Sequence, residues 1–241
     1  MFGKSRPHVA NPIWVLAFCF SVVSSIPLSA PTGEILASRQ LSQLMKWAAI
    51  GDSYASGVAA GARLPGAASR RCSRFDGSYP VILNNDPALG DNPNRQFRDF
   101  ACSGSKIADV LNDQVPQLDT DEEMVTLTVG GNNVGFADLV DACIYQFRPR
   151  PADCETQIQA NLDIINGDQL STNLDAFFKT ILSRVSNSGP AFRLYVTGYA
   201  SFWNDATTQC NGVSWSFWNQ RQNRVYSLRN YAASSTTWPQ H

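Results

Sequence analysis

Residues 46–57 read KWAAIGDSYASG, a short apolar run that leads through a glycine into a polar turn. Lys46 to Ile50 has the length and character of a strand, and a strand, a tight glycine turn and a helix fit the whole stretch. Ser53 would then stand at the start of the helix, where the backbone N–H groups favour developing negative charge. The alternative is a serine that only caps the helix. The stretch therefore predicts either a nucleophilic serine or a capping one.

Three more apolar runs extend this pattern along the chain. Strands are expected at 96–101, 124–129 and 192–196, and the second of these is the clearest buried run. Residues 170–185 carry apolar side chains at helical spacing, whereas 61–95 is rich in Gly, Pro, Arg and Asn and is expected to be irregular. Strands that alternate with helices favour an α/β fold with a parallel sheet, whose sites lie beyond the carboxyl ends of the strands.

Two further glycine-containing turns come after predicted strands. Gly104 comes after the run at 96–101, and a glycine there lets the backbone N–H approach a substrate. Asn132 belongs to the GGNN stretch at 130–133, and its side chain can donate an N–H to an oxyanion. Each residue taken alone has an ordinary alternative, a turn glycine and an Asx-turn asparagine.

The combination is more specific than its parts. The turns around Ser53, Gly104 and Asn132, in this order, together with CSRFDGSYP at 72–80 and NVGF at 133–136, resemble the SGNH (GDSL) hydrolase family. The likeness is greatest to its secreted esterase and lipase branch. The resemblance implies a three-layer α/β/α flavodoxin-like fold with a parallel sheet. It also implies that Ser53 is the nucleophile, and that its N–H, Gly104 and Asn132 form the oxyanion hole.

The chain departs from the family pattern at the base that should activate the serine. A serine hydroxyl is a weak nucleophile until a base takes its proton, and the chain contains only His8 and His241. The family carries an Asp-x-x-His block near its C-terminus, or a backbone carbonyl three residues before the histidine. Here only the carbonyl of Trp238 could play that part for His241, which is the candidate base. The alternative is that His241 is a frayed terminal residue.

Length and charge bound the organisation of the chain. Its 241 residues fit a signal peptide at 1–30, an SGNH hydrolase domain at 46–218 that lacks its last strand, and an atypical tail at 219–241. The apolar run at 13–26 is shorter than the roughly 20 residues of a spanning helix, so no stable membrane span is expected; a membrane anchor is the alternative. A net charge of -1 gives no footprint for nucleic acid.

Five cysteines remain after removal of the signal peptide, an odd number for a secreted chain. Cys143 and Cys154 are close enough in sequence to close a small loop, and Cys72 and Cys102 form a reasonable second pair. Cys210 is left alone. In the family branch that the chain resembles, a cysteine near this position pairs with one beside the histidine block, and that partner is missing here.

The predicted function is hydrolysis of a small ester or lipid by a secreted, monomeric enzyme. No His/Cys spacing indicates a metal site and no glycine loop indicates a bound phosphate, so no metal and no cofactor are expected. Acyl lipids, small soluble esters and acetylated glycans all fit as substrates. One alternative is an inactive or truncated protein of the same fold. Another is a non-catalytic lipid- or glycan-binding protein, with a groove lined by the aromatic residues Trp203, Trp215, Phe217 and Trp218.

Overall fold

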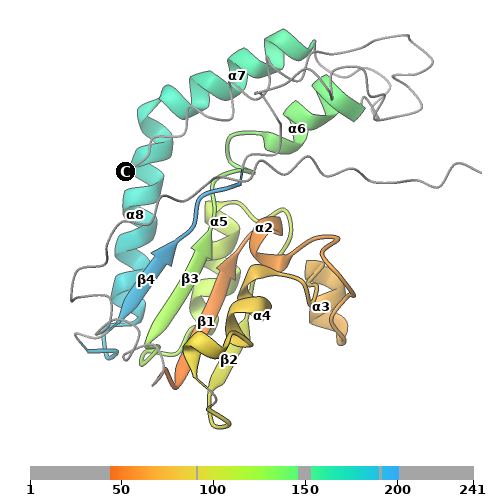
Figure 1. Ribbon diagram of the computed structural model, residues 1–241. Coiled ribbons are helices and arrows are strands. Elements are labelled where there is room, and N and C mark those ends of the chain that lie inside the picture. Colours follow the sequence, from red (N-terminus) through yellow and green to blue (C-terminus); the bar gives the residue numbers. More distant parts are fainter. Residues whose placement is uncertain (1–43, 91, 146–152, 190–191, 201–241) are drawn as a thin grey trace, which may run out of the picture.

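The computed structural model describes residues 44–90, 92–145, 153–189 and 192–200, and these residues contain a four-stranded sheet (Figure 1). The strand order is β2-β1-β3-β4, and each strand runs parallel to its neighbours. The strands are β1 (Lys46–Gly51), β2 (Gln96–Asp99), β3 (Met124–Thr128) and β4 (Arg193–Val196). Apart from Gly51, every strand residue lies within a predicted run. The prediction of a parallel α/β sheet is therefore confirmed.

Helical segments connect the strands in the described part of the chain. The α-helices are α2 (Ser53–Ser56), α3 (Ala67–Cys72), α4 (Tyr79–Asn84), α5 (Ile107–Asp109), α6 (Phe136–Val140), α7 (Cys154–Asn166) and α8 (Asp168–Arg184). The other segments are the 3-10 turns η1 (Pro87–Leu89) and η3 (Val115–Gln117) and the π-helical turns η2 (Val110–Gln114) and η4 (Asp141–Tyr145). The prediction that 61–95 is irregular was wrong, because α3, α4 and η1 lie there. Each is at most six residues long, too short for a helical period to be visible in the sequence.

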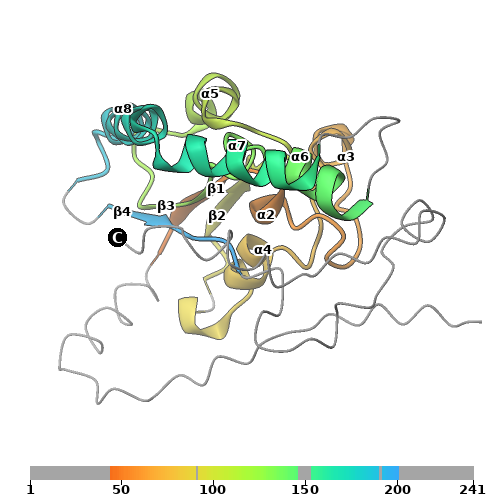
Figure 2. The same ribbon diagram turned by 90° about the horizontal axis from the view of Figure 1, so that it is seen from above.

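Alternation along β1 divides the core into two layers. Ala48 and Ile50 point to one face of the sheet, and Trp47 and Ala49 point to the other. The first face packs against α5, η2 and α8, and the second packs against α4 (Figure 2). Phe177 contributes to the apolar stripe of α8 and is fully buried. Helices therefore cover both faces of the sheet, and the three-layer α/β/α architecture is confirmed.

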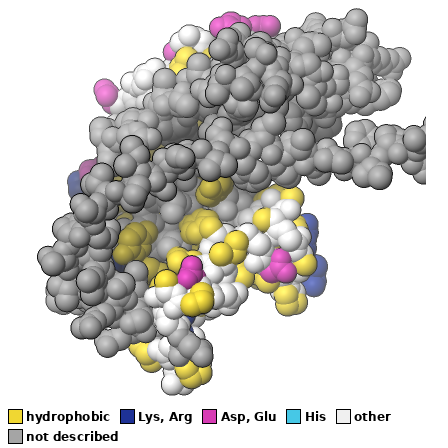
Figure 3. Space-filling model, in the orientation of Figure 1, with side chains coloured by type: hydrophobic (Ala, Val, Ile, Leu, Met, Phe, Trp, Pro, Cys, Tyr) yellow, Lys and Arg dark blue, Asp and Glu magenta, His cyan; other side chains and the backbone are white. Residues whose placement is uncertain are grey.

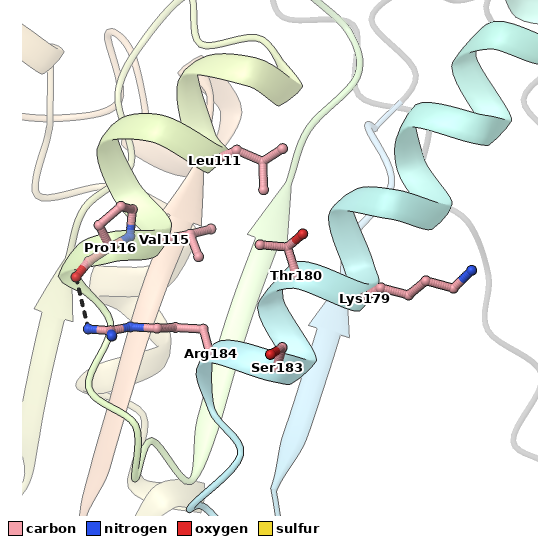
Figure 4. A pocket seen from close by; sticks show the side chains of 7 residues that line it. All are labelled: Leu111, Val115, Pro116, Lys179, Thr180, Ser183 and Arg184. Atoms are coloured by element: carbon pink, nitrogen blue, oxygen red, sulfur yellow. Dashed lines mark hydrogen bonds between the residues drawn. The ribbon is translucent and has the colours of Figure 1, made fainter.

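Arg184 forms hydrogen bonds that connect α8 to the segment before β3. Its Nε donates to the carbonyl of Leu118 (2.9 Å) and its Nη2 to the carbonyl of Pro116 (3.0 Å). Figure 4 shows the bond from Arg184 to Pro116 at a groove between α8 and the η2–η3 segment, which Leu111, Val115 and Thr180 also line. The groove lies on a helical face of the sheet rather than at the carboxyl edge of the strands.

β4 is the last strand within the described residues. Its residues Tyr195 and Val196 are 44% and 53% exposed. Several sequence predictions concern the chain from residue 201 to residue 241, which lies outside the described residues. The missing last strand, the atypical tail, the lone Cys210 and the aromatic groove therefore stay predictions, as do the limits of the domain.

Two disulfides fix loops around the sheet. Cys72 is joined to Cys102 and Cys143 to Cys154, the same pairs that the sequence predicted, with separations of 30 and 11 residues. A disulfide restricts the unfolded chain more when its loop is longer. Replacing Cys72 and Cys102 by alanine should lower the free energy of unfolding by about 3.6 kcal/mol, and replacing Cys143 and Cys154 should lower it by about 2.8 kcal/mol. Urea denaturation of the two double variants checks this, and a larger loss for the Cys143–Cys154 pair would contradict it.

Candidate active site

The three residues predicted to act together all come after strands that lie side by side. Ser53 follows β1, Gly104 follows β2 and Asn132 follows β3 (Figure 1). The strand order reverses at β1, because the chain moves from β1 outward to β2 and then returns to β3 on the other side. Ligands of open parallel sheets bind at the carboxyl ends of the strands at such a point. The fold therefore brings the three turns to one edge of the sheet.

Asp52, and not Ser53, caps the helix that begins at this turn. The Asp52 carboxylate accepts a hydrogen bond from the Tyr54 backbone N–H (3.0 Å), and Ser53 is the first residue of α2. Gly51 just before it has φ +136°, and a Cβ there would lie 2.3 Å from the carbonyl oxygen of Thr128. Only glycine permits this close approach of β1 to β3. The alternative that Ser53 is a capping residue was wrong, and its half-buried side chain is left for another role.

Asn132 is tied to the loop that contains Gly104. Its Nδ2 donates to the carbonyl of Ser105 at 2.9 Å, and a side-chain amide has a second N–H to donate. The neighbouring Asn133 supports the local backbone: its Oδ1 accepts from the N–H of Ile107 at the start of α5 (2.9 Å). Gly104 is exposed, with φ +87°, and an added Cβ would meet no atom within 4 Å. Among the described residues, the space beside Gly104 is therefore open.

Tyr199 links the Asp52 turn to the loop after β3, and sequence reasoning missed it. Its hydroxyl donates to the Asp52 carboxylate and accepts from the Gly131 N–H (2.9 Å). Burial raises the pKa of Asp52 above its usual value, although the bond from Tyr199 acts in the opposite direction. Burial and the neighbouring carboxylate also raise the pKa of Tyr199, so its hydroxyl stays protonated and able to donate. The only local signal for Tyr199 is its place shortly after the fourth strand.

Tyrosine rings border the same turn. The ring of Tyr54 lies 5.7 Å from that of Tyr199 in an edge-to-face arrangement and 6.1 Å from that of Tyr79. Aromatic side chains of this kind offer apolar surface together with a polar tip. The turn at Ser53 therefore stands beside a cluster of three half-buried tyrosine rings, the aromatic wall of Tyr54, Tyr79 and Tyr199.

Neither histidine of the chain belongs to the described part of this edge. His8 and His241 both lie outside the described residues, and Figure 3 shows no histidine on the described face. Within the described ranges there is also no group of His, Cys, Asp and Glu side chains that could hold a metal ion. No helix among those residues is long and apolar enough to cross a bilayer. The described part of the site thus holds the predicted serine and donors, whereas both histidines lie outside the described residues.

A largely buried ion pair joins Arg74 to Asp99 at the end of β2. The Arg74 Nε is 3.9 Å from Asp99 Oδ1 and donates to the carbonyl of Ala101 (2.7 Å). Burial raises the pKa of Asp99 to about 6, and Arg74 only partly offsets this. The folded chain therefore binds this proton more tightly than the unfolded chain does. The resulting stability is complete below about pH 4 and is lost as the pH rises through about 6.

This pair predicts a pH effect on stability that a single substitution removes. Between pH 4 and pH 7, Asp99 should lower the free energy of unfolding by about 2–3 kcal/mol. In the Asp99→Asn variant the difference between these two pH values should be smaller by that amount, because asparagine does not titrate. Urea midpoints at both pH values check this. The same pH difference in the variant and the wild type would show that Asp99 does not cause it.

A serine at a turn from a strand to a helix is the position of the nucleophile in α/β-hydrolases, and an asparagine side chain can serve as an oxyanion donor. No family model matches the chain. It is 32% identical to Lipase 1 of Streptomyces coelicolor over 168 residues, which cover 70% of this chain and 57% of the relative. It is also 32% identical to a lipase of Streptomyces rimosus over 172 residues, 71% of this chain and 59% of the relative. The chain thus spans somewhat under two thirds of the length of these curated relatives.

Solved structures give the same relationship. An extracellular lipase from Streptomyces rimosus matches with a TM-score of 0.58 and 28% identity, over 79% of this chain and 72% of that one. Phospholipase A1 from Streptomyces albidoflavus matches with a TM-score of 0.59 and 27% identity, over 80% of this chain and 73% of that one. The chain is therefore similar in sequence and in fold to these Streptomyces lipases, in agreement with its resemblance to the SGNH hydrolase family.

Proposed function

We propose that this protein hydrolyses carboxylic esters and that Ser53 is its nucleophile. The Ser53 Oγ attacks the ester carbonyl, the alcohol leaves, and water then releases the acyl group from the serine. The N–H groups of Ser53 and Gly104 and the free N–H of Asn132 would hold the oxyanion during both steps. The observation that carries the proposal is the hydrogen bond from Asn132 to Ser105. It joins the turn that contains Asn132 to the turn that contains Gly104.

His241 is our candidate for the base. It is the only histidine that follows the serine in the sequence, as the base does in the family. The carbonyl of Trp238, three residues before it, would accept the second ring N–H and orient the imidazole. His241 would take the Ser53 proton during attack and return it to the leaving alcohol. A folded protein without such a base would bind esters and turn over very little.

The proposed substrates are acyl esters of lipids outside the cell. Two relatives are named lipases and one structural neighbour is a phospholipase A1. The aromatic wall of Tyr54, Tyr79 and Tyr199 offers apolar surface for an acyl chain. Secretion is supported by the signal-peptide pattern at 1–30 and by the extracellular lipase among the structural neighbours. We further propose that the protein acts as a monomer.

A series of nitrophenyl esters with short to long acyl chains tests this function. We expect the purified chain to release nitrophenol from them and to prefer the longer acyl chains, because these bury more apolar surface. His241→Ala should reduce the rate to background. A fully active His241→Ala variant would refute the assignment of the base but not ester hydrolysis. A folded wild-type chain with no turnover on any ester would overturn the proposed function.

A further inference from the structure

A buried glutamine contacts the nucleophile turn from behind. Gln114 is the last residue of η2 and is 2% exposed. Its Oε1 accepts from the backbone N–H of Gly51 (2.7 Å), and its Nε2 donates to the carbonyl of Gly51 (2.9 Å). The side-chain amide thus pairs with both polar groups of one residue, as a neighbouring peptide would in a sheet. Gly51 lies two positions before Ser53. Gln114 therefore holds the backbone that leads into the Ser53 turn.

The same amide also contacts the second turn of the site. The other N–H of Gln114 Nε2 donates to Ser105 Oγ (3.1 Å), and Ser105 is the residue directly after Gly104. The Ser105 carbonyl accepts from Asn132 Nδ2 (2.9 Å). Hydrogen bonds therefore run without a break from Gly51 through Gln114 and Ser105 to Asn132. Both donors of the Gln114 amide are used, and they reach two different turns.

The local backbone supports a special role for this position. η2 is a π-helical turn between α5 and η3, and π-helical turns are rare and often occur at functional sites. Gly51 already has a backbone partner, because its carbonyl also accepts from the N–H of Cys102 (3.0 Å). The bond from Gln114 to Ser105 is not required to satisfy the polar groups of Gly51. The contact with Ser105 adds a connection between turns.

We propose that Gln114 is a positioning residue that holds the Ser53 turn and the oxyanion donors Gly104 and Asn132 in register. The proposal rests on the proposed ester hydrolysis. Gln114 does not touch the substrate; it acts through Gly51 and Ser105. A misplacement of about 1 Å in reacting groups can lower a rate about 10²-fold. Loss of Gln114 would leave the buried N–H of Gly51 without this acceptor, while the Gly51 carbonyl keeps the bond from Cys102, and the Ser53 turn would shift to give the N–H a new partner.

The test compares Gln114→Leu with Gln117→Leu in the full-length chain. Gln117 lies on the adjoining η3 and is exposed, and among the described residues its side chain donates to the carbonyl of Asp113 (2.6 Å). On a soluble nitrophenyl ester we expect Gln114→Leu to lower kcat about 10- to 100-fold with KM changed less than about threefold. Gln117→Leu should leave both constants unchanged. Wild-type kcat in Gln114→Leu would overturn the proposal.

Two further measurements separate positioning from a general loss of stability. In a double-mutant cycle, Gln114→Leu should reduce kcat at least about threefold less in an Asn132→Ala background, because part of its effect passes through Asn132. Equal effects in both backgrounds would contradict the proposal. Amide hydrogen exchange of residues 102–106 should be faster in Gln114→Leu than in Gln117→Leu. This measurement needs no activity: if the wild type proves inactive, the proposed function fails, and unchanged exchange would still refute the role of Gln114.

Discussion

Ser53→Ala is expected to lower kcat for ester hydrolysis on the order of 10⁶-fold, to the background rate. Removing the serine of a serine–histidine unit has about this effect, because the remaining groups cannot form the acyl intermediate. The fold should tolerate the change. Ser53 is the first residue of α2, its side chain is half-buried and the cap is supplied by Asp52. We expect a change of less than about 0.5 kcal/mol in the free energy of unfolding.

Steady-state hydrolysis of a soluble ester measures this loss. Ser183→Ala serves as the matched control, since Ser183 is an exposed serine on α8 at the groove shown in Figure 4. It should keep the wild-type kcat. A Ser53→Ala variant that retains more than about a tenth of the wild-type kcat would show that another group forms the acyl intermediate.

Asn132→Ala is expected to lower kcat by about 10²–10³-fold with little change in KM. Its side chain is proposed to donate to the oxyanion, which carries full charge only in the tetrahedral transition state, so its loss affects the rate more than substrate binding. The Nδ2 hydrogen bond to the Ser105 carbonyl is lost as well. That loss should reduce the free energy of unfolding by about 1 kcal/mol. Michaelis–Menten kinetics together with a urea titration measure both effects.

Asn133→Ala provides the contrast to this variant within the same turn. Asn133 accepts from the N–H of Ile107 and helps to start α5, and we propose no contact with the substrate. Its replacement should lower the free energy of unfolding by about 1 kcal/mol and leave kcat within about threefold of the wild type. If Asn133→Ala lost as much kcat as Asn132→Ala, the special role of Asn132 would be refuted.

Much of the fold could be predicted from local patterns. Buried strands such as Met124–Thr128 are short apolar runs bounded by turns, and all five of its residues are buried. The stripe around Phe177 recurs at helical spacing and packs against the sheet. Local patterns did not reveal α3 and α4. Their residues are mostly half-exposed or exposed, so no apolar period marks them.

The site also contains residues that local sequence predicts and residues that it does not. Ser53, Gly104 and Asn132 were predicted because each occupies a turn shortly after a strand, and strand order brings such turns together. The residues that hold these turns were not predictable from local sequence. Tyr199 bonds to Asp52 across 147 positions, and Gln114 bonds to Gly51 across 63. Such contacts depend on the completed fold, and neither residue has a local motif around it.

Fluorophosphonate labelling of the purified full-length chain tests the central claim that Ser53 is an activated nucleophile. The probe reacts covalently with a serine only when a base and an oxyanion hole assist it. We predict a single adduct, on the peptide that contains Ser53, and its loss in both Ser53→Ala and His241→Ala. A folded wild-type chain that stays unlabelled, or one labelled on a different serine, would contradict the account.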